Sequence, residues 1–309
     1  MSRPKAWVTP SRWTLWARVH TSIIYNHLLL IDKLGLRRTV TFGVLSALCA
    51  ACSSPTSPSV AANSHQLAIS SISSVGSRRN QPSAFADAGE MLTLNATVSG
   101  HAGADVTYLW SGPGTFNGSG AIVSWTAPAS TPTPSTIDLT LVASERYDEG
   151  GTTHASAARS TFPVHVHDSG KEILDMGEEF LSLFSRNAVP TNAVLHNFSA
   201  SCDGGTGRDN EASDTDKARA RYRQDFSKFR VTRLPPVTYN FGGACLVFGS
   251  RFRHADACSL LEVHWEFTYL VDEDGHKAGD HGVTDGVDSV TAVLENGEWR
   301  LCASDFQGR

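Results

Sequence analysis

The chain has 309 residues, of which 40% are apolar and 18% charged, so it is long enough for two domains and has a globular composition. Its net charge is −5, but residues 1–51 carry seven basic residues and one acidic residue, so the chain without this segment has a net charge of −11. This acidity argues against binding to nucleic acid. No run of about 18 apolar residues occurs, and we expect no conventional membrane-spanning helix.

Residues 1–51 have the pattern of an export leader rather than of a folded domain. Arg37 and Arg38 precede a short apolar run that ends in small residues, and these are the parts of a secretory signal. The segment before residue 34 is long for a leader. We interpret it as an over-long gene start, and a genuinely long leader is the alternative.

Cys52 follows this leader and begins a tether over residues 52–63, in which residues 53–59 are only Ser, Pro and Thr. The arrangement resembles a bacterial lipoprotein signal, although Cys49 stands where Leu is usual. The resemblance implies that the chain is cleaved before Cys52, which is lipidated and anchors the protein in the cell envelope, at the outer membrane or the cell surface. An extended, solvated tether suits an anchor, and plain secretion is the alternative.

Four further cysteines lie in the last third of the chain, which predicts two disulfides in an exported domain. Cys245 and Cys258 flank a polar stretch with the pattern of a hairpin tip, so their pairing is local. That leaves Cys202 to pair with Cys302. A zinc site is the alternative, but no Cys-x-x-Cys or His-x-x-His spacing exists, and we expect no metal.

Residues 64–167 predict an all-β sandwich, because apolar and polar residues alternate in short runs separated by Gly- and Pro-rich turns. The expected strands are 91–98, 106–110, 121–125, 137–143 and 161–167. The segment resembles the PKD/Ig-like repeats of bacterial surface proteins. The residues that carry this resemblance are Tyr108-Leu109-Trp110-Ser111, Gly114-Thr115-Phe116, Ser124-Trp125-Thr126-Ala127-Pro128 and Phe162-Pro163-Val164-His165-Val166.

Two pairs of side chains in this segment have simple structural interpretations. Trp110 and Trp125 are expected in the core of the sandwich. His165 and His167 alternate with apolar residues, so we expect them on the solvated outer face of an edge strand.

Residues 170–309 predict an α+β domain in which three helices pack on a curved antiparallel sheet. The first helix covers 171–186 and a short second helix begins at Pro190. The third helix is expected to begin at Ser213-Asp214-Thr215-Asp216 and to bury Ala218, Tyr222, Phe226 and Phe229. The expected strands are 237–241, 246–248, 261–271, 287–294 and 298–306, the last two joined by an Asn-Gly turn.

This order of elements resembles the NTF2-like (SnoaL-like) superfamily. The residues that carry the resemblance are Phe180-Leu181-Ser182-Leu183-Phe184, Val194 to Ser199, Leu261 to Val271, and Asn296-Gly297-Glu298-Trp299-Arg300-Leu301. It implies a cone with a cavity between the sheet and the helices. Strict alternation places Glu262, His264 and Glu266 on the opposite face of the strand 261–271, and a one-residue bulge would reverse this placement. The candidate pocket residues are Trp265, Phe267, Tyr269, Tyr239, Tyr222 and His196.

We therefore expect a lipid-anchored cell-envelope protein in which an Ig-like spacer presents an NTF2-like domain to a small apolar ligand or another envelope protein. Pairing of two such sheets is a candidate for a homodimer. The alternative is an envelope enzyme of the SnoaL-like isomerase or dehydratase type, with a proton-transfer pair such as His196 and Tyr222 in the cone. Two titratable side chains converging in the largest pocket would favour the enzyme. No catalytic residue is assigned, and no cofactor is expected.

Overall fold

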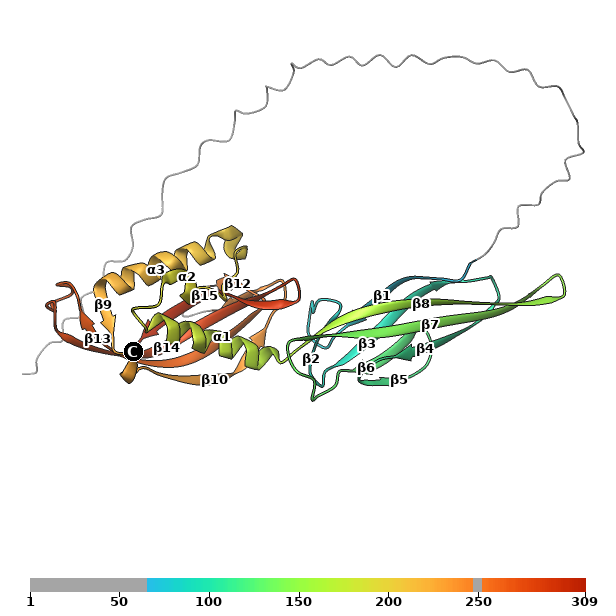
Figure 1. Ribbon diagram of the computed structural model, residues 1–309, viewed down its shortest axis with the longest axis horizontal. Helices are drawn as coiled ribbons and strands as arrows, with labels where there is room; N and C mark the ends of the chain where they lie inside the picture. Colours follow the sequence, from blue (N-terminus) through green and yellow to red (C-terminus); the bar gives the residue numbers. More distant parts are fainter. Residues whose placement is uncertain (1–65, 247–251) are drawn as a thin grey trace, which may run out of the picture. The chain divides into compact units, whose positions relative to one another are not determined.

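The computed structural model describes residues 66–246 and 252–309, which are built mostly of β-strands with few helices (Figure 1). These residues belong to one compact unit. Cys52 and the leader lie outside the described residues, so the anchor and its signal stay predictions.

The first eight strands form two four-stranded sheets. One has the order β1 (Ala68–Val75), β3 (Met91–Ser99), β6 (Ile122–Thr126), β5 (Thr115–Asn117). The other has the order β2 (Phe85–Asp87), β8 (Thr152–His167), β7 (Ser135–Glu149), β4 (Asp105–Ser111). Residues of both sheets meet in one hydrophobic core that includes Trp110 and Trp125, as the alternation predicts. The indole nitrogens of these two residues donate to the carbonyls of Gly120 (3.0 Å) and Pro113 (2.9 Å).

His167 corrects one prediction, because it is buried and only 1% exposed. Strand β8 is not an edge strand: it lies between β7 and the short parallel strand β2. The imidazole Nδ1 of His167 is 2.8 Å from Glu172 Oε2, and the ring stacks on Phe85 with 5.2 Å between centroids. Phe85 belongs to the same buried cluster as Ile173 and Trp299, so hydrophobic packing continues from β2 into the second half of the chain.

The second half begins with three α-helices, α1 (Ser169–Phe184), α2 (Thr191–Val194) and α3 (Gly207–Arg221), with a 3-10 turn, η1 (Cys202–Gly205), before α3. The main sheet has the order β10 (Arg230–Tyr239), β13 (Ala257–Tyr269), β14 (His281–Glu295), β15 (Glu298–Gly308). Strand β9 (Tyr222–Gln224) also pairs with β13, η2 (Phe226–Lys228) follows it, and β11 (Ala244–Leu246) pairs with β12 (Phe252–His254). Apolar side chains of α1, α2 and the main sheet share one core.

The predicted third helix is wrong in its bounds. Helix α3 begins at Gly207 rather than at Ser213 and ends at Arg221, so Tyr222 lies in β9 and Phe226 in the separate 3-10 helix η2. The spacing of Tyr222, Phe226 and Phe229 fits a helical period, but Tyr222 pairs with Tyr269 at the edge of β13 and satisfies its backbone there. Phe226 is 43% exposed and so does not belong to a buried helical stripe. Strand pairing of Tyr222 therefore overrides the helical pattern of the sequence.

The hairpin between β14 and β15 follows the prediction. Asn296 and Gly297 have φ values of 52° and 80°, and two positive values in succession are what a tight type I′ turn requires. Strand β10 is longer than predicted because it continues through Pro235 and Pro236, where the pairing with β13 shifts register.

Both predicted disulfides are present. Cys202–Cys302 joins η1 to β15 with 5.5 Å between Cα atoms, and Cys245–Cys258 joins β11 to β13 with 6.0 Å. Two disulfides suit an oxidising environment outside the cytoplasm. Across the described ranges, no helix is long and apolar enough to cross a bilayer.

Candidate functional site

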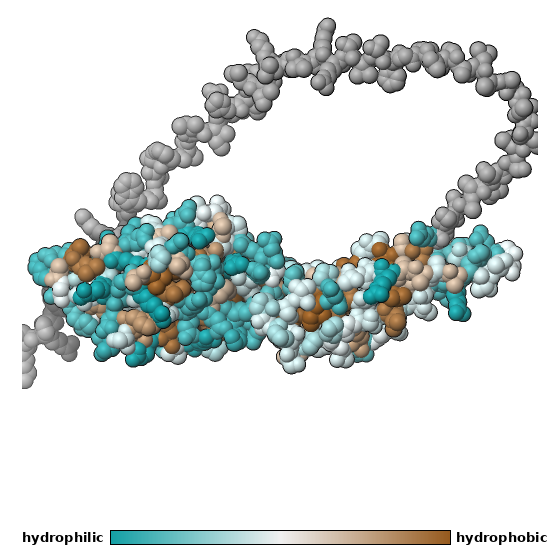
Figure 2. Space-filling model, viewed as in Figure 1, coloured by the Kyte–Doolittle hydropathy of each residue, from teal (hydrophilic) through white to brown (hydrophobic). Residues whose placement is uncertain are grey.

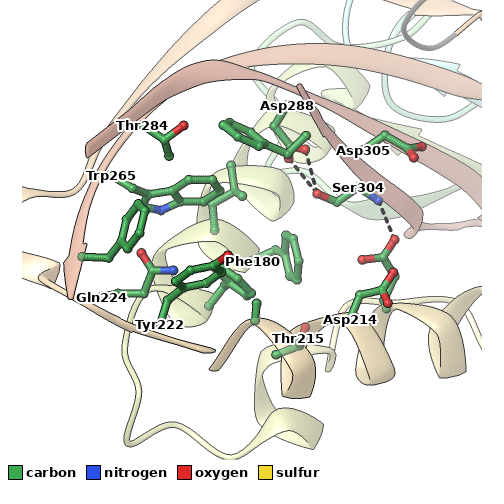
Figure 3. A pocket seen from close by; sticks show the side chains of 16 residues that line it. Phe180, Asp214, Thr215, Tyr222, Gln224, Trp265, Thr284, Asp288, Ser304 and Asp305 are labelled. Atoms are coloured by element: carbon green, nitrogen blue, oxygen red, sulfur yellow. Dashed lines mark hydrogen bonds between the residues drawn. The ribbon is translucent and has the colours of Figure 1, made fainter. Parts of the chain in front are cut away.

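A cavity of about 480 Å³ lies within the second half of the chain, between helices α1 and α3 and the strands β9, β13, β14 and β15. This size is within the range of small-molecule sites. Its aromatic side chains are Phe180, Phe184, Tyr222, Trp265, Phe267 and Phe306. Its polar side chains are Glu211, Asp214, Thr215, Gln224, Thr284, Asp288, Ser304 and Asp305 (Figure 3). On the face drawn in Figure 2, hydrophobic side chains form only small patches among hydrophilic ones.

Trp265 is the centre of the aromatic wall. It is 7% exposed, and its ring centroid lies 5.7 Å from that of Phe184 and 4.7 Å from that of Phe306. Strand β13 places Trp265 here because its pairing with β14 runs without a bulge, so the alternation predicted from the sequence holds. Glu266 and His264 accordingly lie on the opposite face, where His264 contacts Asp285 at 2.7 Å.

The polar end of the cavity is a chain of three residues from three elements. The hydroxyl of Ser304 on β15 donates to both carboxylate oxygens of Asp288 on β14, at 2.9 and 2.8 Å. The backbone N–H of Ser304 donates to Glu211 Oε1 on α3, at 3.0 Å. Figure 3 shows these contacts as dashed lines, with Asp214 and Asp305 close by. Two carboxyl groups therefore converge on one serine.

Both carboxyl groups are easier to keep neutral than an ordinary acid. The pKa of Asp288 is raised to about 7, mainly by burial and to a smaller extent by the negative charge of neighbouring Asp305. Burial also raises the pKa of Glu211 to about 8, with the negative charges of Asp288, Asp305 and Asp214 acting in the same direction. Near neutral pH the two acids therefore carry protons that they can donate. In their ionised form they can bind a cation.

The opposite side of the cavity holds two polar atoms without hydrogen-bond partners among the described residues, Trp265 Nε1 and Gln224 Oε1. Figure 3 shows Trp265 and Gln224 together with Tyr222, away from Asp305 and Asp214. The hydroxyl of Tyr222 is already engaged, because it donates to Glu273 Oε2 at 3.1 Å. A buried donor and a buried acceptor without partners are costly unless a ligand satisfies them.

Comparisons with family models, with curated proteins and with solved structures found no match. The site is therefore interpreted from its own chemistry.

The structure brings three of the six predicted pocket residues together, Trp265, Phe267 and Tyr222. The other three do not line this cavity. Tyr269 stacks on His276 with 4.4 Å between centroids. Tyr239 lies under the guanidinium of Arg78, 4.3 Å from its ring centroid, and burial raises its pKa to about 12. His196 is exposed, because α2 ends at Val194 and the ring turns back to the carbonyl of Ala193 at 2.9 Å.

Sequence reasoning missed the acidic end of the cavity. One signal was present: Asp288 alternates with Val290 and Ala292, so a carboxyl group occupies an inward position of an apolar strand. Glu211 had no such signal, since only Gly207 and Thr215 of α3 are buried. Over the described residues, no group of three or more His, Cys, Asp or Glu side chains is arranged to hold a metal ion.

Proposed function

We propose that the protein is a lipid-anchored cell-envelope protein in which an Ig-like domain over residues 64–167 is a spacer for an NTF2-like domain over residues 170–309. The NTF2-like domain binds a small ligand with an apolar body. The observation that carries this proposal is the cavity of about 480 Å³, which combines an aromatic wall with a few polar groups at its ends. The predicted acylation of Cys52 and the two disulfides support the location.

Binding of an apolar dye to the wild type and to a variant whose cavity is filled by a larger side chain tests this function. N-phenyl-1-naphthylamine is neutral at pH 7 and its fluorescence rises in apolar surroundings. Ala218 lines the cavity from α3, whereas Ala220 on the same helix is exposed. We expect the dye to bind the wild type and Ala220→Trp, and to bind Ala218→Trp at least tenfold more weakly. Equal binding by the two variants would place the dye elsewhere and refute the proposal.

A second candidate function is favoured by one observation, the convergence of Asp288 and Glu211 on Ser304. Two carboxyl groups with pKa values near neutrality can act as general acid and base, as an isomerase or dehydratase requires. This pair replaces His196 and Tyr222 as the proton-transfer candidate. Extracts of the native envelope incubated with the protein in D2O would test it. Deuterium uptake into one compound with wild type and not with Asp288→Asn supports an enzyme, and uptake with neither refutes it.

A further inference from the structure

The charged groups of the cavity have one sign. Four carboxyl groups line it, from Glu211, Asp214, Asp288 and Asp305, and no lysine, arginine or histidine is among its described lining residues. The negative charge of Asp214 is balanced by Lys217, which does not line the cavity and whose Nζ lies 2.9 Å from Asp214 Oδ1. Glu211 and Asp288 accept hydrogen bonds from Ser304, and no cation contacts either in the described structure. These two acids are therefore the groups that a positive ligand would meet.

The aromatic walls of the cavity suit a positive ligand that also has an apolar body. Aromatic rings offer a large flat surface on which the apolar body of a ligand can pack. Trp265 is more than nine-tenths buried, and its indole N–H lacks a partner at the cavity side that it shares with Gln224. An ammonium group would be met by carboxylates at one end, and an oxygen acceptor on the body of the ligand would satisfy Trp265 at the other.

We propose that the cavity takes an organic cation, in which a primary ammonium group is joined to an apolar body that carries a hydrogen-bond acceptor. This inference rests on the proposed binding function and specifies its ligand class. The ammonium group donates to Asp288 and Glu211 and relieves the repulsion among the carboxylates. The apolar body packs on the aromatic wall around Trp265.

Binding of such a cation is coupled to proton release. The groups that face Asp288 and Glu211 are Asp305 on β15 and Asp214 on α3, while α1 and β13 contribute apolar side chains. Burial raises the pKa of Asp288 to about 7 and that of Glu211 to about 8, so both acids lose protons when a cation binds near neutral pH. Cation affinity therefore rises with pH between 5.5 and 8.5, because the ionised carboxylates attract the ligand.

Calorimetric titration of the wild-type protein with three matched probes tests the inference. The probes are 4-phenoxybutylamine, 4-phenoxybutan-1-ol and 4-phenoxybutanoate, which share one body and differ in charge. At pH 8 we expect the amine to bind at least tenfold more tightly than the alcohol, and the carboxylate to bind most weakly. The preference for the amine shrinks at pH 5.5, and titrations in phosphate and in Tris show protons released at pH 7.

Two outcomes overturn parts of the account separately. If the alcohol binds as tightly as the amine at pH 8, the ligand class is wrong while the binding function stands. If none of the probes binds and N-phenyl-1-naphthylamine also fails to bind, both fail. Asp288→Asn and Glu211→Gln should bring the amine preference to about twofold, mainly through a loss of affinity for the amine. Asp274→Asn, at an exposed turn, is the matched control and keeps the preference.

Discussion

The burial of the Asp288 carboxyl group can be measured by comparing how the free energy of unfolding depends on pH in the wild type and in Asp288→Asn. Asp288 is 0% exposed, and among the described residues it accepts hydrogen bonds from the Ser304 hydroxyl, which an asparagine oxygen can also accept. The pKa of Asp288 is about 7 in the folded protein against 3.8 for an ordinary aspartate. Between about pH 4 and pH 7 the folded state therefore holds a proton that the unfolded chain has already lost.

The sign and size of the effect follow from this difference. Because folded Asp288 binds a proton that the unfolded chain has lost, its contribution to wild-type stability falls as pH rises from about 4 to about 7 and then levels off. About three pKa units correspond to an upper value of about 4 kcal/mol. The asparagine variant lacks this loss, so its free energy of unfolding relative to wild type should increase by up to about 4 kcal/mol between pH 4 and pH 8. The matching gain in melting temperature is roughly 8–16 °C.

Urea and thermal unfolding followed by tryptophan fluorescence at pH 4, 6 and 8 measure this difference directly. Asp274→Asn serves as the control, because Asp274 is exposed and its replacement should leave the pH dependence unchanged. A constant stability difference between Asp288→Asn and wild type across this range would refute the reasoning. So would a wild-type advantage that grows with pH.

Three further predictions concern the bridges, the packing and the anchor. Cys302→Ser opens a loop of 100 residues and should lower the free energy of unfolding by about 5 kcal/mol, whereas Cys258→Ser opens a loop of 13 residues and should lower it by about 3 kcal/mol. Chemical unfolding measures both losses, and a larger loss for Cys258→Ser would contradict the account. Gly177 of α1 faces the sheet, where an added Cβ would lie 2.9 Å from Leu261 Cδ1, so Gly177→Leu should lower the free energy of unfolding by about 1–3 kcal/mol in urea titrations. Unchanged stability would contradict the close packing of α1 on the sheet at Gly177. Cys52→Ser should move the protein from the membrane fraction to the soluble fraction, and unchanged fractionation would rule out the lipid anchor.

The strands were predictable because burial on one face leaves a period of two in the sequence. The inward position of Trp265 and the outward position of His264 follow from that period alone. The third helix was not predictable in the same way. Residues 207–221 bear no apolar stripe, so the helix is set by its contacts, and the periodic aromatics after it belong to β9 and to the turn beyond.

The candidate site was half predictable. Its aromatic wall comes from one strand, whose pattern is local and visible in the sequence. Its acidic end joins Glu211 of α3, Asp288 of β14 and Ser304 of β15, and no local pattern reports that these three residues meet. The burial of His167 escaped prediction for a similar reason, because the short strand that covers β8 lies about 80 residues earlier in the chain.

Native mass spectrometry of the protein purified from its native cells tests most directly whether the cavity is a ligand site. Wild type and Ala220→Trp should carry the same small-molecule adduct, and Ala218→Trp should carry none, because its indole fills the space that the ligand occupies. Identical spectra for wild type and Ala218→Trp, with or without an adduct, would contradict the account.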